Sequence, residues 1–167
     1  QGYRLVAAQV PDFIASNART EAPKAKAADQ IRVASFNVLN FFTGETAANP
    51  FPTRRGATDA NELQRQQAKM IAALSRMDAD VIGLLEVENN GFEARSALAT
   101  IVRELNKALG DNRYAFVKPD NSQGNDAIKV ALIYNQQKVT EAGKAAVTAQ
   151  GPFAYGSRAP LAQSFQA

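Results

Sequence analysis

Two polar side chains interrupt stretches that otherwise have the composition of buried strands. Asn37 lies within the run SFNVLN, and Glu86 directly follows Val-Ile-Gly-Leu-Leu. Burial disfavours the charged form of a carboxylate unless a cation or strong hydrogen-bond donors compensate. A hard divalent cation such as Mg²⁺ compensates well, because one or two carboxylates hold it while water and phosphate oxygens complete its coordination. Glu86 and Asn37 are therefore candidate metal ligands. The alternative is structural: Glu86 lies at a solvated strand end and pairs with a lysine, and Asn37 hydrogen-bonds to nearby backbone.

Polar residues in the loops add candidates for a phosphate site. Asp126 lies in the glycine-containing segment QGNDAIKV, where it is either a catalytic residue or an ordinary turn aspartate. Arg158, in GSRAPL, has a guanidinium that can donate two hydrogen bonds to a phosphate, or it can remain solvated. The pair Arg54-Arg55 is open to the same two interpretations, contact with a nucleic-acid backbone or exposure to water.

Histidine and cysteine are both absent from the 167 residues. The lack of cysteine excludes a disulfide framework and thiolate metal sites. Histidine is the side chain whose unperturbed pKa lies nearest neutral pH, so its absence has to be explained by any interpretation as a hydrolase. The charge balance, 19 Lys and Arg against 16 Asp and Glu, does not by itself indicate a nucleic-acid partner.

The overall composition is that of a globular domain, with 46% hydrophobic residues. The apolar runs fall far short of the roughly 18 consecutive residues that a membrane span requires, so no membrane association is expected. The sequence begins with Gln1 and lacks a charged segment leading into an apolar one. We therefore expect the chain to begin inside a longer precursor.

The hydrophobic pattern predicts the order strand, helix, strand, helix, followed by consecutive strands, and hence an α/β (α+β) fold. Segments 31–39 and 80–87 are compact apolar runs, typical of strands buried on both faces. One helix is predicted from the capping pair Asp59 and Glu62 to about Met77, and a second over 98–109, ended by Gly110. Short extended runs at 114–117, 128–134, 139–147 and 161–165 predict antiparallel strands.

Strand periodicity predicts which face carries each candidate ligand. By alternation, Asn37 shares a face with Val33 and Ser35, and Glu86 shares a face with Ile82 and Leu84. Residues 41–58, with two glycines and two prolines, predict a long loop between the first strand and the first helix.

The chain is expected to have three parts. Residues 1–16, in which 3–6 and 13–14 resemble short strands, are predicted to be the tail of an upstream strand-rich domain. Residues 17–30 are rich in alanine and charge and predict a linker. Residues 31–167 are predicted to be the N-terminal portion of a domain, because the sequence stops directly after a strand-like run.

Six motifs occur in one order: RVASFNVLNFF, RGA, RQQAKMIAAL, DADVIGLLEVEN, GNDAIKVALIY and SRAPLAQSF. Together they resemble the extracellular nuclease branch of the endonuclease/exonuclease/phosphatase (deoxyribonuclease-I-like) superfamily, from about Arg32 to Gln166. The resemblance implies the first half of a four-layer α/β/β/α sandwich with mixed sheets. It also implies that the family's histidines belong to a missing C-terminal half, so that this chain alone is inactive.

The resemblance further implies hydrolysis of nucleic acid, DNA above all, with Mg²⁺ or with Mn²⁺ or Ca²⁺ in its place. Glu86 matches the principal metal ligand, and Asn37 matches an asparagine that orients metal and phosphate. Arg158 matches an arginine that contacts backbone phosphate, although Ala159 follows it where the family has glutamate. Asp126 falls near a tyrosine that supports the scissile phosphate. The family implies a secreted, extracellular or periplasmic bacterial protein.

Two other functions fit the same motifs. The fold also serves enzymes that act on phosphomonoesters or phospholipids, because fold alone does not determine the substrate. The region is alternatively a non-catalytic nucleic-acid-binding or adhesion module that keeps the fold and has lost the chemistry. Asn40, Glu88 and Asn89 flank the two core motifs and are candidates to support the metal ligands.

Overall fold

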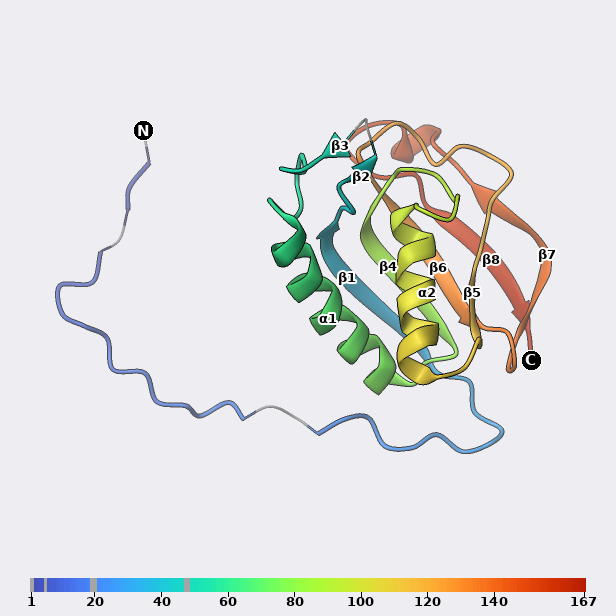
Figure 1. Ribbon diagram of the computed structural model, residues 1–167, viewed down its shortest axis with the longest axis horizontal. Helices are drawn as coiled ribbons and strands as arrows, with labels where there is room; N and C mark the ends of the chain where they lie inside the picture. Colours follow the sequence, from blue (N-terminus) through green and yellow to red (C-terminus); the bar gives the residue numbers. More distant parts are fainter. Residues whose placement is uncertain (1, 5, 19–20, 47–48) are drawn as a thin grey trace.

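The computed structural model describes every residue except 1, 5, 19–20 and 47–48. Its elements follow the predicted order, with a mixed α/β arrangement (Figure 1). They are β1 (Val33–Phe41), β2 (Glu45–Thr46), β3 (Asn49–Pro50), α1 (Ala60–Met77), β4 (Val81–Glu88), α2 (Ala97–Leu109), β5 (Tyr114–Phe116), β6 (Ile128–Asn135), β7 (Thr140–Val147), the 3₁₀ turn η1 (Gly151–Phe153) and β8 (Leu161–Gln166).

A mixed four-stranded sheet is the centre of the fold, with strand order β1-β4-β6-β5. β1 and β4 are parallel, whereas β6 is antiparallel to both β4 and β5. Helices α1 and α2 cover the same face of this sheet (Figure 1). The core lies between the two layers and includes Met70, Ile71 and Leu74 of α1, Leu98, Ile101 and Leu105 of α2, and Ile82, Leu84 and Val87 of β4.

The helix ends confirm the predictions made from capping residues. The Asp59 side chain accepts a hydrogen bond from the Glu62 amide at 2.8 Å and so begins α1. The Glu62 carboxylate accepts from the amide and hydroxyl of Thr58 and not from the Asp59 amide of a standard capping box. Gly110 ends α2 in a left-handed conformation, φ +65°, that glycine adopts without strain.

The β1 strand has one buried and one exposed face. As alternation predicts, Phe36 and Val38 face the helices, whereas Val33 is 71% exposed on the face that also carries Asn37. The prediction that this strand is buried on both faces is therefore wrong. The β7–β8 hairpin covers another part of the sheet face that points away from the helices. There the Tyr134 ring of β6 packs against the Phe165 ring of β8, with 5.2 Å between the ring centroids.

The end of the predicted linker is docked onto the domain. Asp80 is fully buried, and its carboxylate binds Lys26 Nζ at 2.6 Å and the Arg32 amide at 2.9 Å. This ion pair fixes the chain that leads into β1 against the turn between α1 and β4. The earlier segment extends away from the domain (Figure 1). Residues 13–14 form no strand there, and the strand predicted at 3–6 includes residue 5, which lies outside the described residues.

Candidate functional site

Both strands that carry the predicted ligands are irregular at the ligand positions. In the parallel pair, Asn37 lies opposite Leu85, and Phe41 lies opposite Val87. Residues 38–40 of β1 therefore lie opposite Glu86 alone. Leu39 and Asn40 absorb the extra length with left-handed backbone angles, φ +58° and +48°.

The bulge in β4 moves Glu86 away from the core. Leu84 lies opposite Ala131 of β6 and Val87 lies opposite Lys129, so Leu85 and Glu86 share the space facing residue 130. Glu86 has φ +64°, and Val87 takes the next core position with no exposed surface. The prediction that Glu86 shares a face with Ile82 and Leu84 is therefore wrong, because the extra residue shifts the alternation.

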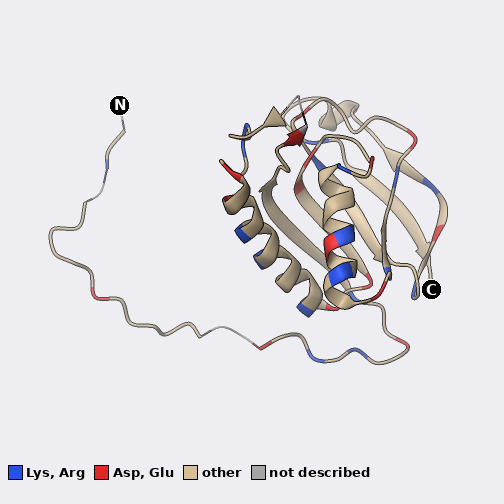
Figure 2. Cartoon of the chain, in the orientation of Figure 1, with Lys and Arg blue, Asp and Glu red and all other residues tan. Residues whose placement is uncertain are grey.

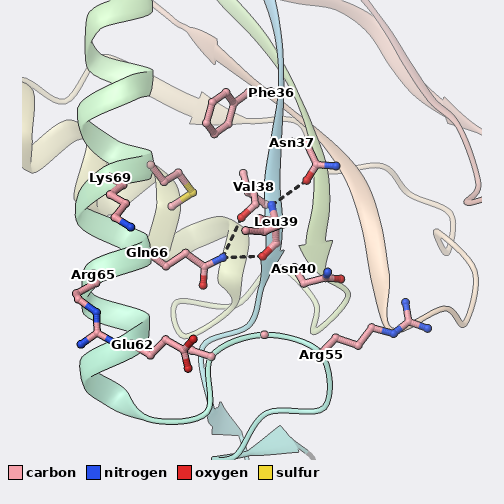
Figure 3. Close-up of a pocket in the computed structure, with 13 residues that line it drawn as sticks. Phe36, Asn37, Val38, Leu39, Asn40, Arg55, Glu62, Arg65, Gln66 and Lys69 are labelled. Atoms are coloured by element: carbon pink, nitrogen blue, oxygen red, sulfur yellow. Dashed lines mark hydrogen bonds between the residues drawn. The ribbon is translucent and has the colours of Figure 1, made fainter. Parts of the chain in front are cut away.

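Hydrogen bonds connect the two bulges. The Glu86 carboxylate accepts from the Asn40 amide at 3.1 Å, and the Asn37 side-chain oxygen accepts from the Leu39 amide at 2.8 Å. Gln66 of α1 donates to the carbonyls of Val38 and Leu39 at 3.0 and 2.7 Å (Figure 3). The helix thus holds the backbone that brings Asn37 and Glu86 to the same end of the sheet. The backbone hydrogen bond foreseen for Asn37 is present.

Asp126 lies in the bend two residues before β6 and binds two arginines from different loops. Its carboxylate lies 3.3 Å from Arg55 Nη1 and 3.5 Å from Arg158 Nε, and it also accepts from the Ile128 amide at 3.2 Å. The Ile128 amide and then the two guanidinium groups lower the pKa of Asp126, so it is ionised at neutral pH. Among the described residues, no hydrogen bond joins it to Asn37 or Glu86. The structure brings together Asp126, Arg158 and Arg55, which the sequence indicated as separate candidates.

The position of Arg55 depends on the glycine that follows it. A side chain at Gly56 would place its Cβ 2.5 Å from the Asn40 carbonyl oxygen. Only glycine therefore allows the loop to pack directly on the β1 bulge. This contact explains the RGA motif in physical terms and places Arg55 beside Asn40.

Glu88, which the sequence marked only as a flanking residue, is the buried carboxylate of this region. It is 3% exposed and accepts hydrogen bonds from the Thr43 amide, the Thr43 hydroxyl, Asn49 Nδ2 and Asn90 Nδ2 at 2.8–3.3 Å. These donors compensate its desolvation without a cation. Asn89 binds the carbonyls of Gly124 and Asp126 and so fixes the loop before β6. Both residues support the loops around the site.

The oxygen atoms of Glu86 and Asn37 are a minimal set of ligands for a hard divalent cation. Glu86 offers one carboxylate, of which one oxygen is bound to the Asn40 amide, and Asn37 offers an amide oxygen on the neighbouring strand. Mg²⁺ is commonly held by one or two protein carboxylates, with water and substrate phosphate as the other ligands. Within the part of the chain that the structure describes, no group of three acidic side chains gathers at one point. A cation here would therefore depend on substrate oxygens.

A groove of about 590 Å³ opens beside these residues, between α1 and β1. Asn37, Asn40 and Arg55 line it on the strand side, and α1 contributes the other wall (Figure 3). Asn37 itself projects from the side of β1 that faces away from α1 (Figure 3).

Comparison with known proteins assigns no family. Neither a scan against protein-family models nor a search of the curated proteins found a match. Neither α1 nor α2 is suited to cross a bilayer, since no helix within the described residues combines sufficient length with an apolar composition. The geometry of the site and the sequence motifs are therefore the basis for a function.

Proposed function

We propose that this chain forms part of a divalent-metal-dependent nuclease of the endonuclease/exonuclease/phosphatase superfamily, which hydrolyses phosphodiester bonds of nucleic acid, DNA above all. One observation carries the proposal. Paired bulges in adjacent parallel strands bring Asn37 and Glu86 to one end of the sheet. Glu86 takes a left-handed backbone conformation there, and such strain is concentrated at functional sites.

In this proposal Glu86 and Asn37 hold Mg²⁺, or Mn²⁺ or Ca²⁺ in its place. The cation would stabilise the negative charge that develops on the phosphate during hydrolysis. Arg158 and Arg55 bind the phosphate of the substrate, since guanidinium groups donate paired hydrogen bonds to phosphate oxygens. Asp126 orients the two arginines and does not itself touch the reacting atoms. The proton-transferring histidines would come from elsewhere in a longer protein.

The part of the sheet's second face that the β7–β8 hairpin does not cover supports the further proposal of a four-layer sandwich. Leu85 is 39% exposed and lies opposite Asn37, on the face that also carries Val33 and Ser35 and points away from the helices. A second sheet packed on this face would bury these residues and complete the layers. We also propose, by the same resemblance, that the protein is secreted or periplasmic.

The test compares Glu86→Gln with Glu93→Gln, which alters an exposed carboxylate in the loop before α2. Mn²⁺ binding to the 167-residue chain is measured by calorimetry, and plasmid nicking is measured in a longer protein that contains it. We expect Glu86→Gln to abolish nicking and weaken Mn²⁺ binding, and Glu93→Gln to change neither. Unchanged nicking in Glu86→Gln would refute the metal-site assignment. It would favour the alternative that this region is a non-catalytic module of the longer protein.

Substrate class is tested with the same longer protein. Release of acid-soluble nucleotides from DNA supports a nuclease. Faster release of phosphate from inositol phosphates, or of headgroups from phospholipids, would overturn the assignment to nucleic acid while leaving the metal site intact.

A further inference from the structure

The groove beside β1 has two chemically different parts. Its floor is apolar and includes Phe36, Val38 and Met70, whereas its rim includes Arg55, Arg65 and Lys69. In Figure 3, Arg65 and Lys69 extend from α1, and Arg55 lies across the groove on the opposite loop. A volume of about 590 Å³ is within the range of small-molecule sites, roughly 300–1,000 Å³.

The two cations on α1 are available to a ligand. Arg65 and Lys69 are one helical turn apart, so they project from the same side of α1, and both are exposed. Within the described residues, neither has a carboxylate within ion-pair distance. Figure 2 shows the basic positions along this helix; the one besides Arg65 and Lys69 is Arg76, in the last turn.

The one acidic residue of the groove is already engaged. The Glu62 carboxylate accepts from the Thr58 amide at 2.8 Å and the Thr58 hydroxyl at 2.6 Å. These hydrogen bonds lower the pKa of Glu62 and hold its carboxylate at the start of α1. Within the described residues, the groove therefore presents two cations without a carboxylate partner, Arg65 and Lys69, whereas Arg55 is bound by Asp126.

We propose that this groove binds one nucleotide unit of a single-stranded nucleic acid next to the hydrolysed phosphodiester. Phosphates contact Arg65 and Lys69 on the rim, and the base lies against Phe36, which is partly exposed, whereas Val38 and Met70 of the floor are buried. Sites for single strands combine a cationic track with apolar or aromatic surface for the bases. A duplex keeps its bases stacked inside and would leave this floor unused. The inference depends on the proposed function, because Arg55 and Asn40 join the groove to the Glu86 site.

The test measures binding of a labelled single-stranded oligothymidylate to the 167-residue chain by fluorescence anisotropy, with EDTA present to prevent hydrolysis. The variant is Arg65→Gln/Lys69→Gln, and the control is Lys107→Gln/Lys138→Gln, which removes two exposed cations away from the groove. We expect the groove variant to raise Kd about tenfold and to reduce the slope of log K against log salt by about 1.4, about 0.7 for each lost contact. The control should change neither beyond the small effect of net charge.

A second variant tests the floor. Phe36→Leu keeps an apolar side chain and should raise Kd for the single strand with an unchanged salt slope. Circular dichroism of each variant checks that the fold is retained. A duplex of equal length that binds as tightly as the single strand, or a groove variant equal to the control, would overturn the inference.

The outcomes separate this inference from the proposed function. Glu86→Gln should leave binding in EDTA unchanged, because no metal is involved. If the longer protein nicks plasmid but the groove variant binds the oligothymidylate as the control does, only the single-strand groove is overturned. Groove-dependent binding without nicking by the longer protein overturns the proposed nuclease alone.

Discussion

Replacing Gln66 with leucine is expected to lower the free energy of unfolding by about 2 kcal/mol and to weaken metal binding at Glu86. Gln66 Nε2 donates to two carbonyls of the β1 bulge, at 3.0 Å to Val38 and 2.7 Å to Leu39. A neutral hydrogen bond contributes about 1 kcal/mol net, and a buried carbonyl left unpaired costs about 1–3 kcal/mol. The Leu39 carbonyl is exposed and can bind water, so the loss at Val38 dominates.

Urea denaturation and Mn²⁺ calorimetry test this prediction against Gln64→Leu. Gln64 lies on the exposed side of the same helix, and leucine and glutamine have similar helix propensities, so the control should change stability by less than about 0.5 kcal/mol. The Gln66 variant should also lose about 5 °C in Tm. Equal stability and equal Mn²⁺ affinity of the two variants would refute the view that α1 holds the bulge in place.

Three other substitutions have defined outcomes. Burial lowers the pKa of Lys129 to about 8 from 10.5, so above pH 8 the unfolded chain binds a proton that the folded chain has released. Stability should therefore rise between pH 8 and 9.5 in urea titrations, and Lys129→Met should lose this rise. Lys26→Met leaves the buried Asp80 without its cation and should cost about 3 kcal/mol by the same assay, whereas the exposed Lys24→Met should cost little. At φ +64°, Glu86→Gly should be more stable to heat than Glu86→Ala by about 1 kcal/mol; the reverse order would argue against strain there.

Local signals in the sequence predicted the helices and most strands. The N-cap at Asp59 and the C′ glycine at Gly110 depend on hydrogen bonds within a few residues, so the pattern around them is sufficient. Alternation along β1 likewise predicted that Asn37 shares a face with Val33 and Ser35. The prediction that β1 is buried on both faces was wrong because an apolar run indicates hydrophobicity but does not show which elements pack on each face.

The parts that sequence could not predict involve bulges and distant contacts. Leu39, Asn40 and Glu86 have left-handed angles that no glycine signals, so strict alternation assigned Glu86 to the wrong face. The contact of Asp126 with Arg55 and Arg158 joins loops that are far apart in the chain. Their proximity follows from the strand order of the sheet, which periodicity alone does not determine.

Glu86 and Glu88, the two carboxylates of β4, have different environments because the bulge adds one residue to the strand. Glu88 lies on the buried side again, and its carboxylate accepts four hydrogen bonds, from the amide and hydroxyl of Thr43 and from the side chains of Asn49 and Asn90. Glu86 is held out of the core and, among the described residues, accepts one hydrogen bond, from the Asn40 amide. Its left-handed backbone angle costs about 1 kcal/mol or more for a residue with a side chain. A glycine there would be more stable, and a carboxylate adds no packing to the core. We therefore propose that the role of Glu86 lies in what its other carboxylate oxygen binds, and a divalent metal is the first ligand to test.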